Sequence, residues 1–326
     1  MNLLFLRGAV PRDRDPRQIM FDTLDACDDV WTQLVSHLAK DGYGEVWYWG
    51  GKRKVVYRDN FIERWVPDYK SHKLSFTPDV IFARGGFPQY DVVLERFPKA
   101  YRIYYGAGQR FLPQSSFKKY NLILVDTPKQ LNKARKNFPS IRSELFIKPA
   151  ADNVFKPYNE SKIYDVIFSS NEHKSGIKGH NFILPQFPND LKMIQTGISS
   201  PKLRAKYPNI EFTGWIPRRE LPVLYSKSKI AVVCCTDKDS CPRVIPEALA
   251  CGCPLLILNS VNLWHDKYIT EQTGKIVSSE DFFIEMRSMI NTYREYSPYN
   301  YYRENLSLEK AAEHISKIIG GEKGDV

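Results

Sequence analysis

Residues 239–258, with the sequence DSCPRVIPEALACGCPLLIL, form the stretch that decides the fold of this chain. Its two acids, Asp239 and Glu247, lie eight positions apart at the start of a short apolar segment, which Gly252 and Pro254 end. Such an ending is typical of a helix, and the aliphatic residues 255–258 are typical of a buried strand. Because unpaired N–H groups at a helix start attract anions, we expect a diphosphate near residues 240–244.

Apolar segments alternate with helix-like segments along the whole chain, which is typical of α/β architecture with parallel sheets. Strands are expected at 2–6, 45–49, 80–83, 101–105, 122–125, 164–169, 192–196, 210–213, 230–234 and 255–258. The clearest helices are expected at 25–40 and 308–319. Residues 147–157 contain two prolines and no periodicity, so they predict a linker. We therefore expect two domains, residues 1–150 and 158–326, with the C-terminal helix packing back on the first.

The composition is that of a globular protein, and 326 residues suffice for two hydrophobic cores. No apolar run approaches the roughly 18 residues that a membrane-spanning helix requires, and the apolar start is too short for a signal peptide. We expect no transmembrane segment and a cytoplasmic location, in the host cytoplasm if the protein is viral.

The net charge of +10 is distributed unevenly. Residues 1–150 contain 25 Lys and Arg against 16 Asp and Glu, whereas residues 151–326 contain 22 against 21. The first domain is therefore the basic one. A field of this sign recruits polyanions or anionic membrane surfaces, and it does not determine the fold.

Five of the six cysteines lie within residues 234–253. No pair has the two-residue spacing of a zinc knuckle, and no histidine is placed to complete a site. We therefore expect small buried thiols, without a metal site and without a disulfide framework.

The acid pair, together with the helix and strand after it, closely resembles the donor-site signature of retaining glycosyltransferases of the GT-B fold (group 1, family-4-like). Three further segments match in order: the linker through Asp152, Phe155 and Pro157, residues 212–225, and TGKIV at 273–277. The resemblance implies two Rossmann-like domains whose parallel sheets face each other across a cleft. It implies a hexosyl- or pentosyltransferase (EC 2.4) that needs no cofactor or metal and uses a nucleoside diphosphate sugar, with UDP-sugar expected.

The resemblance also assigns roles to the acids and to one lysine. Asp239, where the family usually has Glu, is expected beside the transferred sugar; a plain helix cap is the alternative. Glu247 is expected to accept hydrogen bonds from the ribose hydroxyls, because a carboxylate only accepts. Lys178, in GIKG at 176–179, is expected to contact the diphosphate.

One departure from the family concerns the second phosphate contact. The family's arginine, five or six residues before the lysine, is replaced here by Glu172 or His173. Lys174 and Arg243 are the candidate substitutes, and for each of them an ordinary surface charge is the favoured alternative. The remaining donor contacts are expected from Ser240, Cys241, Pro242, Val244, Gly214, Trp215 and Ile216.

The acceptor side is predicted from loops that follow strands of the first domain, because ligands of open α/β sheets bind beyond the strands' carboxyl ends. Three such loops, within 7–17, 84–91 and 106–111, each contain Gly and Arg, which allow close backbone approach and phosphate binding. The expected residues are Arg7, Gly8, Arg12, Asp13, Arg84, Gly85, Gly86, Gly108 and Arg110. None of these loops contains a histidine, so no clear general base is predicted.

Three hypotheses remain for the reaction partner. The favoured one is a hydroxymethylated pyrimidine in DNA, as in virus-type base glycosyltransferases, with a flipped base passing Tyr104, Tyr105 or Phe111. The second is a lipid-linked or cell-surface polysaccharide acceptor at an anionic membrane, for which residues 130–138 offer only Leu131 and Phe138 as anchors. The third is a non-catalytic nucleotide-sugar or nucleic-acid-binding protein, which would be expected to lose the acids or the lysine.

Overall fold

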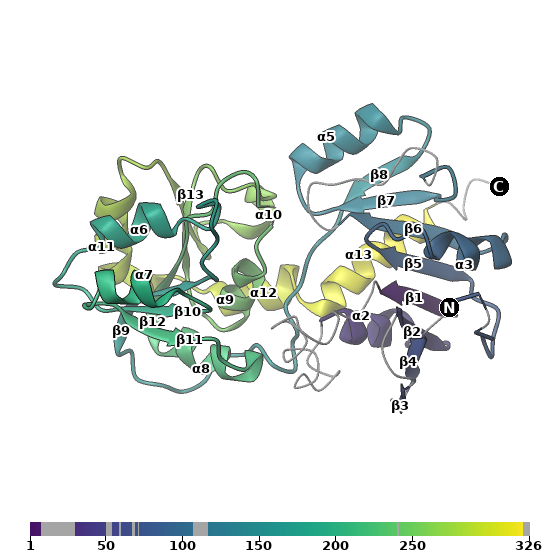
Figure 1. Cartoon of the computed structure of the whole chain (residues 1–326), viewed down its shortest axis with the longest axis horizontal. Coiled ribbons are helices and arrows are strands. Elements are labelled where there is room, and N and C mark those ends of the chain that lie inside the picture. The colour runs from purple at the N-terminus through teal and green to yellow at the C-terminus, as the bar shows by residue number, and fades with distance from the viewer. Residues whose placement is uncertain are drawn as a thin grey trace. The chain divides into compact units, whose positions relative to one another are not determined.

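The structure is a computed structural model that describes residues 1–7, 30–49, 54–58, 60–66, 69–70, 72–106, 117–239 and 241–321. It divides into two compact units, Met1–Ile147 with Ala311–Val326, and Lys148–Lys310 (Figure 1). Each unit contains one sheet whose strands are parallel, apart from one antiparallel edge pair in the first unit. The division falls at the start of the predicted linker, so residues 148–157 belong to the second unit.

The sheet of the first unit has eight strands in the order β3-β4-β2-β1-β5-β6-β7-β8. Their bounds are β1 Leu3–Arg7, β2 Gly44–Trp49, β3 Lys54–Tyr57, β4 Phe61–Val66, β5 Val80–Arg84, β6 Tyr101–Gly106, β7 Leu122–Val125 and β8 Arg142–Leu145. All five strands predicted in this half are present, whereas β3, β4 and β8 were not predicted. The chain order reverses between β1 and β5, which are hydrogen-bonded neighbours.

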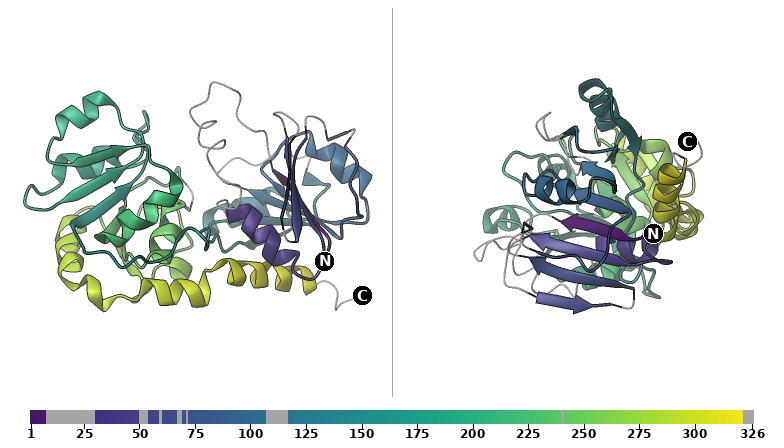
Figure 2. Two further views of the ribbon diagram at one scale, coloured as in Figure 1. Left: turned by 90° about the horizontal axis from the view of Figure 1, so that it is seen from below. Right: turned by 90° about the vertical axis from the view of Figure 1, so that its right-hand side faces the viewer.

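Helices cover both faces of this sheet because its central strands are apolar on both sides. Figure 2 shows α2 (Val30–Leu38) and the C-terminal part of α13 (Leu308–Gly320) on one face and α3 (Tyr90–Arg96) on the other. On the α2 side Trp31 stacks on Phe5, and on the α3 side Leu4 and Leu6 join a core that includes α5 (Pro128–Asn137). The predicted helix 25–40 is described only from Val30.

The C-terminal helix is tied to the edge strand β8 of the first unit. His314 Nε2 lies 2.8 Å from the backbone oxygen of Leu145. Arg142 Nη1 donates to the carbonyl of Ile318 at 3.0 Å. These two bonds attach the residues from Ala311 onward to the first unit.

The sheet of the second unit has six parallel strands in the order β11-β10-β9-β12-β13-β14. Their bounds are β9 Tyr164–Ser169, β10 Met193–Thr196, β11 Glu211–Gly214, β12 Ser228–Val233, β13 Leu255–Leu258 and β14 Gly274–Val277. The helical segments are α6 His180–Gln186, α7 Pro201–Lys206, η2 Arg218–Glu220, α8 Leu221–Ser226, α9 Val244–Ala250, α10 His265–Tyr268, α11 Phe282–Thr292, η3 Tyr293–Glu295 and α12 Pro298–Asn305. This strand order is that of a Rossmann fold, and its switch point lies between β9 and β12.

Five cysteines of the second unit are free and buried, which agrees with the predicted packing role. Burial raises the pKa of the Cys235 and Cys253 thiols to about 12, so both stay protonated. Within the described part of the chain, no helix combines the length and the apolar character needed to cross a membrane.

Candidate functional site

Two predicted site residues meet at the switch point of the second sheet. Lys178 lies in the loop after β9 and Asp239 in the loop after β12, and Lys178 Nζ donates to Asp239 Oδ2 at 2.6 Å. Gly179 makes this approach possible, because a Cβ there would lie 2.2 Å from the carbonyl oxygen of Cys234. The backbone bond from Thr236 N to Ile177 O, at 2.9 Å, holds the two loops together. The paired side chains are 32% and 23% exposed, so a ligand can reach both.

The second predicted acid, Glu247, has a partner that the sequence did not reveal. Glu247 lies in the first turn of α9, and its buried Oε1 accepts a hydrogen bond from Arg218 Nη2 at 2.7 Å. The guanidinium of Arg218 lies 5.0 Å from the ring centroid of Phe155. A buried carboxylate requires a partner, and Arg218 directly follows the predicted base-lining segment 212–217, so the signal was present but not used.

Helix α9 begins later than the acid pair suggested. Its first residue is Val244, and the residue before it, Arg243, makes no side-chain capping bond. Asp239 lies outside this helix and pairs with Lys178, so the helix-cap alternative for Asp239 is wrong. The segment before α9 is a turn, which we call the donor turn and define as Asp239 and residues 241–243.

The donor turn contains an unusual backbone conformation. Cys241 has a φ of 40°, and within the described ranges it is the only residue other than glycine with a positive φ. Its N–H donates to the carbonyl of Asn262 at 2.9 Å, and its carbonyl accepts from Lys148 Nζ at 2.7 Å. Pro242 and Val244 are partly buried and Arg243 is exposed, while Ser240 lies outside the described residues.

Two polar atoms beside the donor turn are buried without a partner. Thr236 Oγ1 and Asn262 Nδ2 make no hydrogen bond within the part of the chain that the structure describes. Thr236 also accepts the backbone N–H of Asp239 on its carbonyl, at 3.1 Å. Buried polar groups of native proteins are normally bonded, so these two atoms indicate a place where further hydrogen bonds form.

The predicted base-lining residues follow β11, on the outer side of the switch point. Gly214 ends β11 with a φ of 68°, a conformation that glycine adopts without strain. Its carbonyl accepts from Gly197 N at 2.9 Å, which ties the β10 and β11 loops together. Trp215 is 40% exposed and Ile216 is partly buried, so both present apolar surface.

Glu172, at a position where the family has an arginine, stabilises the start of α7 in this chain. Glu172 Oε2 accepts the backbone N–H of Ser200 at 2.6 Å, and this bond lowers the pKa of Glu172. Ser200 in turn caps α7 through its side chain. Glu172 is therefore an anion that holds the start of α7, whereas Lys174 nearby is exposed.

In the first unit, two predicted acceptor-side arginines lie next to each other at the switch point. Arg7 ends β1, Arg84 ends β5, and the two residues are paired in register. The Arg7 guanidinium lies 5.3 Å from the ring centroid of Tyr48, and that of Arg84 lies 5.0 Å from that of Trp31. Gly85 follows with a φ of 78°, and Gly86 is partly buried.

Six residues expected on the acceptor side lie outside the described residues: Gly8, Arg12, Asp13, Gly108, Arg110 and Phe111.

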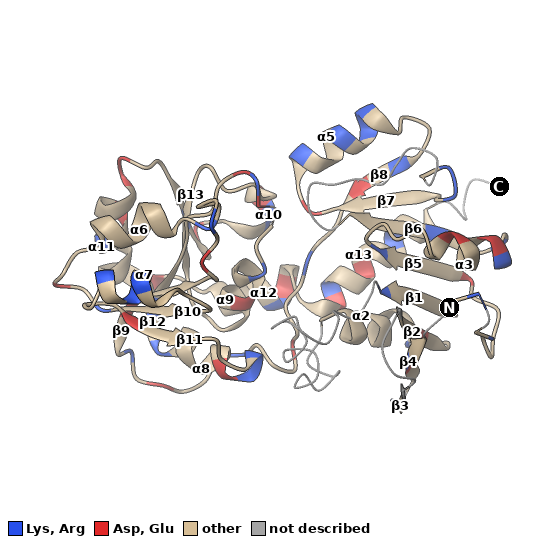
Figure 3. Ribbon diagram, viewed as in Figure 1, with Lys and Arg blue, Asp and Glu red and all other residues tan. Residues whose placement is uncertain are grey.

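The structure contradicts two of the three aromatic contacts expected for the acceptor, and both expected apolar anchors. Tyr104 and Tyr105 are 1% and 0% exposed, and Tyr105 donates to Asp126 Oδ1 at 2.6 Å, so neither ring can stack on a flipped base. Leu131 and Phe138 belong to the core, so neither is a membrane anchor. The charged residues that α5 exposes are all basic, as Figure 3 shows: Lys129, Lys133, Arg135 and Lys136.

Comparisons with known proteins agree with this geometry. Residues 165–291 match the family described as glycosyl transferases group 1. A sucrose-phosphate synthase from Thermosynechococcus elongatus superposes with a TM-score of 0.70 at 12% identity, covering 100% of both chains. A glycosyltransferase from Rickettsia africae gives 0.68 at 12% identity, covering 100% of this chain and 99% of that one. Anabaena HepE in complex with UDP-glucose gives 0.65 at 11% identity, covering 98% and 100%.

At such identities the likeness to these structures shows the fold alone, and it confirms the predicted α/β architecture of the GT-B type. No curated protein sequence matches the chain.

Proposed function

We propose that this chain, which has the GT-B fold and a group 1 glycosyltransferase match over residues 165–291, transfers a sugar from a nucleoside diphosphate sugar to a hydroxyl group of an anionic acceptor. The observation that carries this proposal is the pairing of two acids with two cations at the second sheet, Lys178 with Asp239 and Arg218 with Glu247. We expect a UDP-sugar, which is the type of donor bound in the HepE structure.

Lys178 has the position and the charge to assist the leaving group. When the bond between the anomeric carbon and the phosphate oxygen breaks, negative charge grows on the diphosphate. An ammonium group held at the switch point stabilises that charge without any rearrangement of solvent. The ion pair with Asp239 holds the Lys178 ammonium group at the switch point. We propose that Lys178 supplies the positive charge that a metal ion supplies in other enzymes.

Asp239 is proposed to lie beside the transferred sugar and to stabilise positive charge at the anomeric carbon. In the proposed retaining reaction, the acceptor oxygen attacks on the face that the diphosphate leaves. One C–O bond to the phosphate breaks, one C–O bond to the acceptor forms, and the hydroxyl proton moves to the departing phosphate oxygen. This route needs no general base, which agrees with the lack of a predicted histidine.

Glu247 is proposed to bind the ribose. A carboxylate has about four acceptor positions, and the bond from Arg218 uses one of them on Oε1. The others suit the two hydroxyls of a ribose. Gly214, Trp215 and Ile216 are proposed to contact the base, and Thr236 Oγ1 and Asn262 Nδ2 offer further hydrogen bonds beside the donor turn.

For the acceptor, we propose a polyanion, with DNA containing hydroxymethylated pyrimidines as the first candidate. The exposed basic face of α5 has no apolar anchor, because Leu131 and Phe138 are in the core. A surface of this kind fits a phosphate backbone better than the interior of a bilayer. Arg7 and Arg84 add two guanidinium groups at the first switch point.

The donor half of this proposal is tested by mixing the purified protein with individual sugar nucleotides and measuring release of the nucleoside diphosphate. We expect release with one class of donor and its loss in Lys178→Ala, with Lys202→Ala, an exposed lysine of α7, as the matched control. No release by the wild type would favour a binding protein, and equal rates in Lys178→Ala and the wild type would indicate a different site.

The acceptor half is tested by offering hydroxymethylated DNA, unmodified DNA and anionic vesicles with a labelled donor at low salt. Label in the modified DNA alone supports the first candidate. Label in a vesicle-borne glycan, with none in modified DNA, would replace it with the lipid-linked or polysaccharide acceptor.

A further inference from the structure

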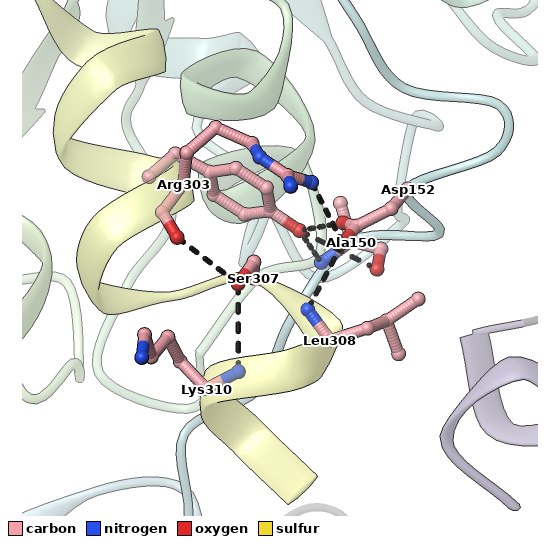
Figure 4. A network of polar contacts seen from close by, with 7 residues as sticks. Ala150, Asp152, Arg303, Ser307, Leu308 and Lys310 are labelled. Carbon is pink, nitrogen blue, oxygen red and sulfur yellow. Dashed lines mark hydrogen bonds and ion pairs between the residues drawn. The ribbon is translucent and has the colours of Figure 1, made fainter. Parts of the chain in front are cut away.

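The segment that joins the two units, residues 148–155, is fixed to the second unit at several points. Asp152 accepts from the Tyr302 hydroxyl at 2.5 Å and from the Leu308 N–H at 3.1 Å, so it connects α12 with the start of α13 (Figure 4). The Tyr302 hydroxyl also accepts the N–H of Ala150 at 3.0 Å. Tyr302 is 1% exposed, so its bond with the Ala150 N–H is shielded from water. The segment is thus an integral part of the second unit.

The first residue of this segment reaches the donor turn. Lys148 Nζ donates to the carbonyl oxygen of Cys241 at 2.7 Å, across 93 positions of sequence. The backbone of Lys148 is itself fixed, because its N–H donates to the Tyr268 hydroxyl at 2.7 Å and its carbonyl accepts from that hydroxyl at 3.1 Å. Tyr268 is fully buried. Lys148 is therefore anchored by its main chain and directs its ammonium group at the donor turn.

The residue that Lys148 contacts is the one whose backbone is strained. A residue with a Cβ avoids the left-handed region, because the Cβ approaches the neighbouring carbonyl oxygen. Cys241 nevertheless has a φ of 40°, and its side chain is fully buried. Such a conformation persists only when surrounding bonds impose it. Here the bonds come from Asn262 on the N–H and from Lys148 on the carbonyl.

We propose that Lys148 is a positioning residue for glycosyl transfer, whose ammonium group holds Cys241 in the left-handed conformation and thereby fixes the donor turn that carries Asp239. The proposal rests on the proposed function, because it concerns the placement of an acid assigned there. It gives the joining segment a role in the donor site that its distance in sequence does not suggest. The turn is positioned through its backbone, so the identity of residue 241 becomes a direct probe of the mechanism.

The kinetic test combines Lys148→Met with substitutions at Cys241. Glycine adopts the left-handed conformation without strain, whereas alanine is as strained as cysteine and also lacks the sulfur atom. We expect Lys148→Met to lower kcat about tenfold or more in the wild-type and Cys241→Ala backgrounds, and less than about threefold in the Cys241→Gly background. Lys156→Met, at an exposed lysine of the same region, is the matched control. An equal loss in all three backgrounds overturns the proposal.

A second measurement does not depend on donor chemistry. Cys241 is buried, so its alkylation by iodoacetamide reports opening of the donor turn. We expect Lys148→Met to accelerate alkylation of Cys241 about tenfold, as measured by peptide mass spectrometry, while Cys253 in the same protein stays slow. Unchanged labelling of Cys241 overturns the proposal. If the wild type consumes no sugar nucleotide, the proposed function fails, and the labelling result still decides whether Lys148 holds the turn.

Discussion

The two sheets of this chain share one strand order around their switch points, yet the side chains at these points differ. In the second unit, Lys178 and Asp239 form an ion pair, whereas in the first unit Arg7 and Arg84 stand in adjacent register, each guanidinium against an aromatic ring. The same topology therefore brings two loops together in both units. What binds there is decided by the loop residues: a paired site suits a neutral sugar with its diphosphate, and an arginine pair suits an anion.

Of the two ion pairs in the second unit, the one between Arg218 and Glu247 is tested by replacing Glu247. Replacing Glu247 with Ala leaves the Arg218 guanidinium, 13% exposed, without its carboxylate. We expect the free energy of unfolding to fall by about 3 to 5 kcal/mol, which urea denaturation measures. The double variant Arg218→Met with Glu247→Gln should lose less than Glu247→Ala, because no buried charge is left alone. If the double variant is the less stable one, the pair does not behave as a buried ion pair.

A second test concerns the positive charge of Lys178 in the ion pair with Asp239. Replacing Lys178 with Ala removes the ammonium group proposed to stabilise the leaving diphosphate. We expect kcat to fall on the order of 10² to 10³ with a smaller change in KM for the donor, because the charge develops mainly in the transition state. Steady-state kinetics with the best donor measures both. A change confined to KM would indicate that Lys178 only binds the ground state.

The second unit also contains a buried imidazole near Lys178, that of His180 at the start of α6. Its Nε2 makes no hydrogen bond to any residue of the described ranges. Burial lowers the pKa of His180 from 6.5 to about 4. A lowered folded-state pKa means that stability is complete above pH 6.5 and falls as the pH decreases towards 4. The loss should amount to roughly 3 kcal/mol. Urea denaturation between pH 7 and 4 measures it, and His180→Gln should flatten this dependence; an unchanged slope would assign it to other groups.

Arg7 and Arg84 of the first unit are expected to affect binding of the acceptor and not of the donor. Replacing Arg84 with Met should raise KM for the acceptor about tenfold, since a charge-assisted hydrogen bond to an anion is lost. Release of nucleoside diphosphate in the absence of acceptor should stay unchanged. Lys99→Met, at an exposed lysine of the same unit, provides the control. An increase in KM for the donor, with none for the acceptor, would move Arg84 to the other half of the reaction.

The sequence predicted the strands that are buried on both faces, because their apolar runs are continuous. It missed β4 and β8, whose sequences FIERWV and RSEL mix apolar with charged residues and resemble loops. A spaced motif predicted Lys178, Asp239 and Glu247 as site residues; the structure pairs the first two with each other and Glu247 with Arg218. The sequence could not identify Lys148, because the contact of Lys148 with Cys241 joins residues 93 positions apart and depends on the folded path of the chain. Arg218 was missed although it directly follows the predicted base-lining segment. The prediction that Tyr104 or Tyr105 meets a base was wrong, since a strand sequence such as YRIYYG does not show which rings face the core.

The smallest expected effect concerns the exposed lysines of α5. It distinguishes their contribution to acceptor binding from that of Arg7 and Arg84. Replacing Lys133 and Lys136 with Ala leaves Arg7 and Arg84 untouched and removes two exposed charges. For a DNA acceptor, we expect a modest loss of affinity. The dependence of log K on log salt should become shallower by about 0.9 for each phosphate contact that is lost. Fluorescence anisotropy of labelled DNA at several salt concentrations measures the slope. A tenfold loss of affinity without a change in slope would show that the helix contributes through its fold, because only the charge contribution depends on salt.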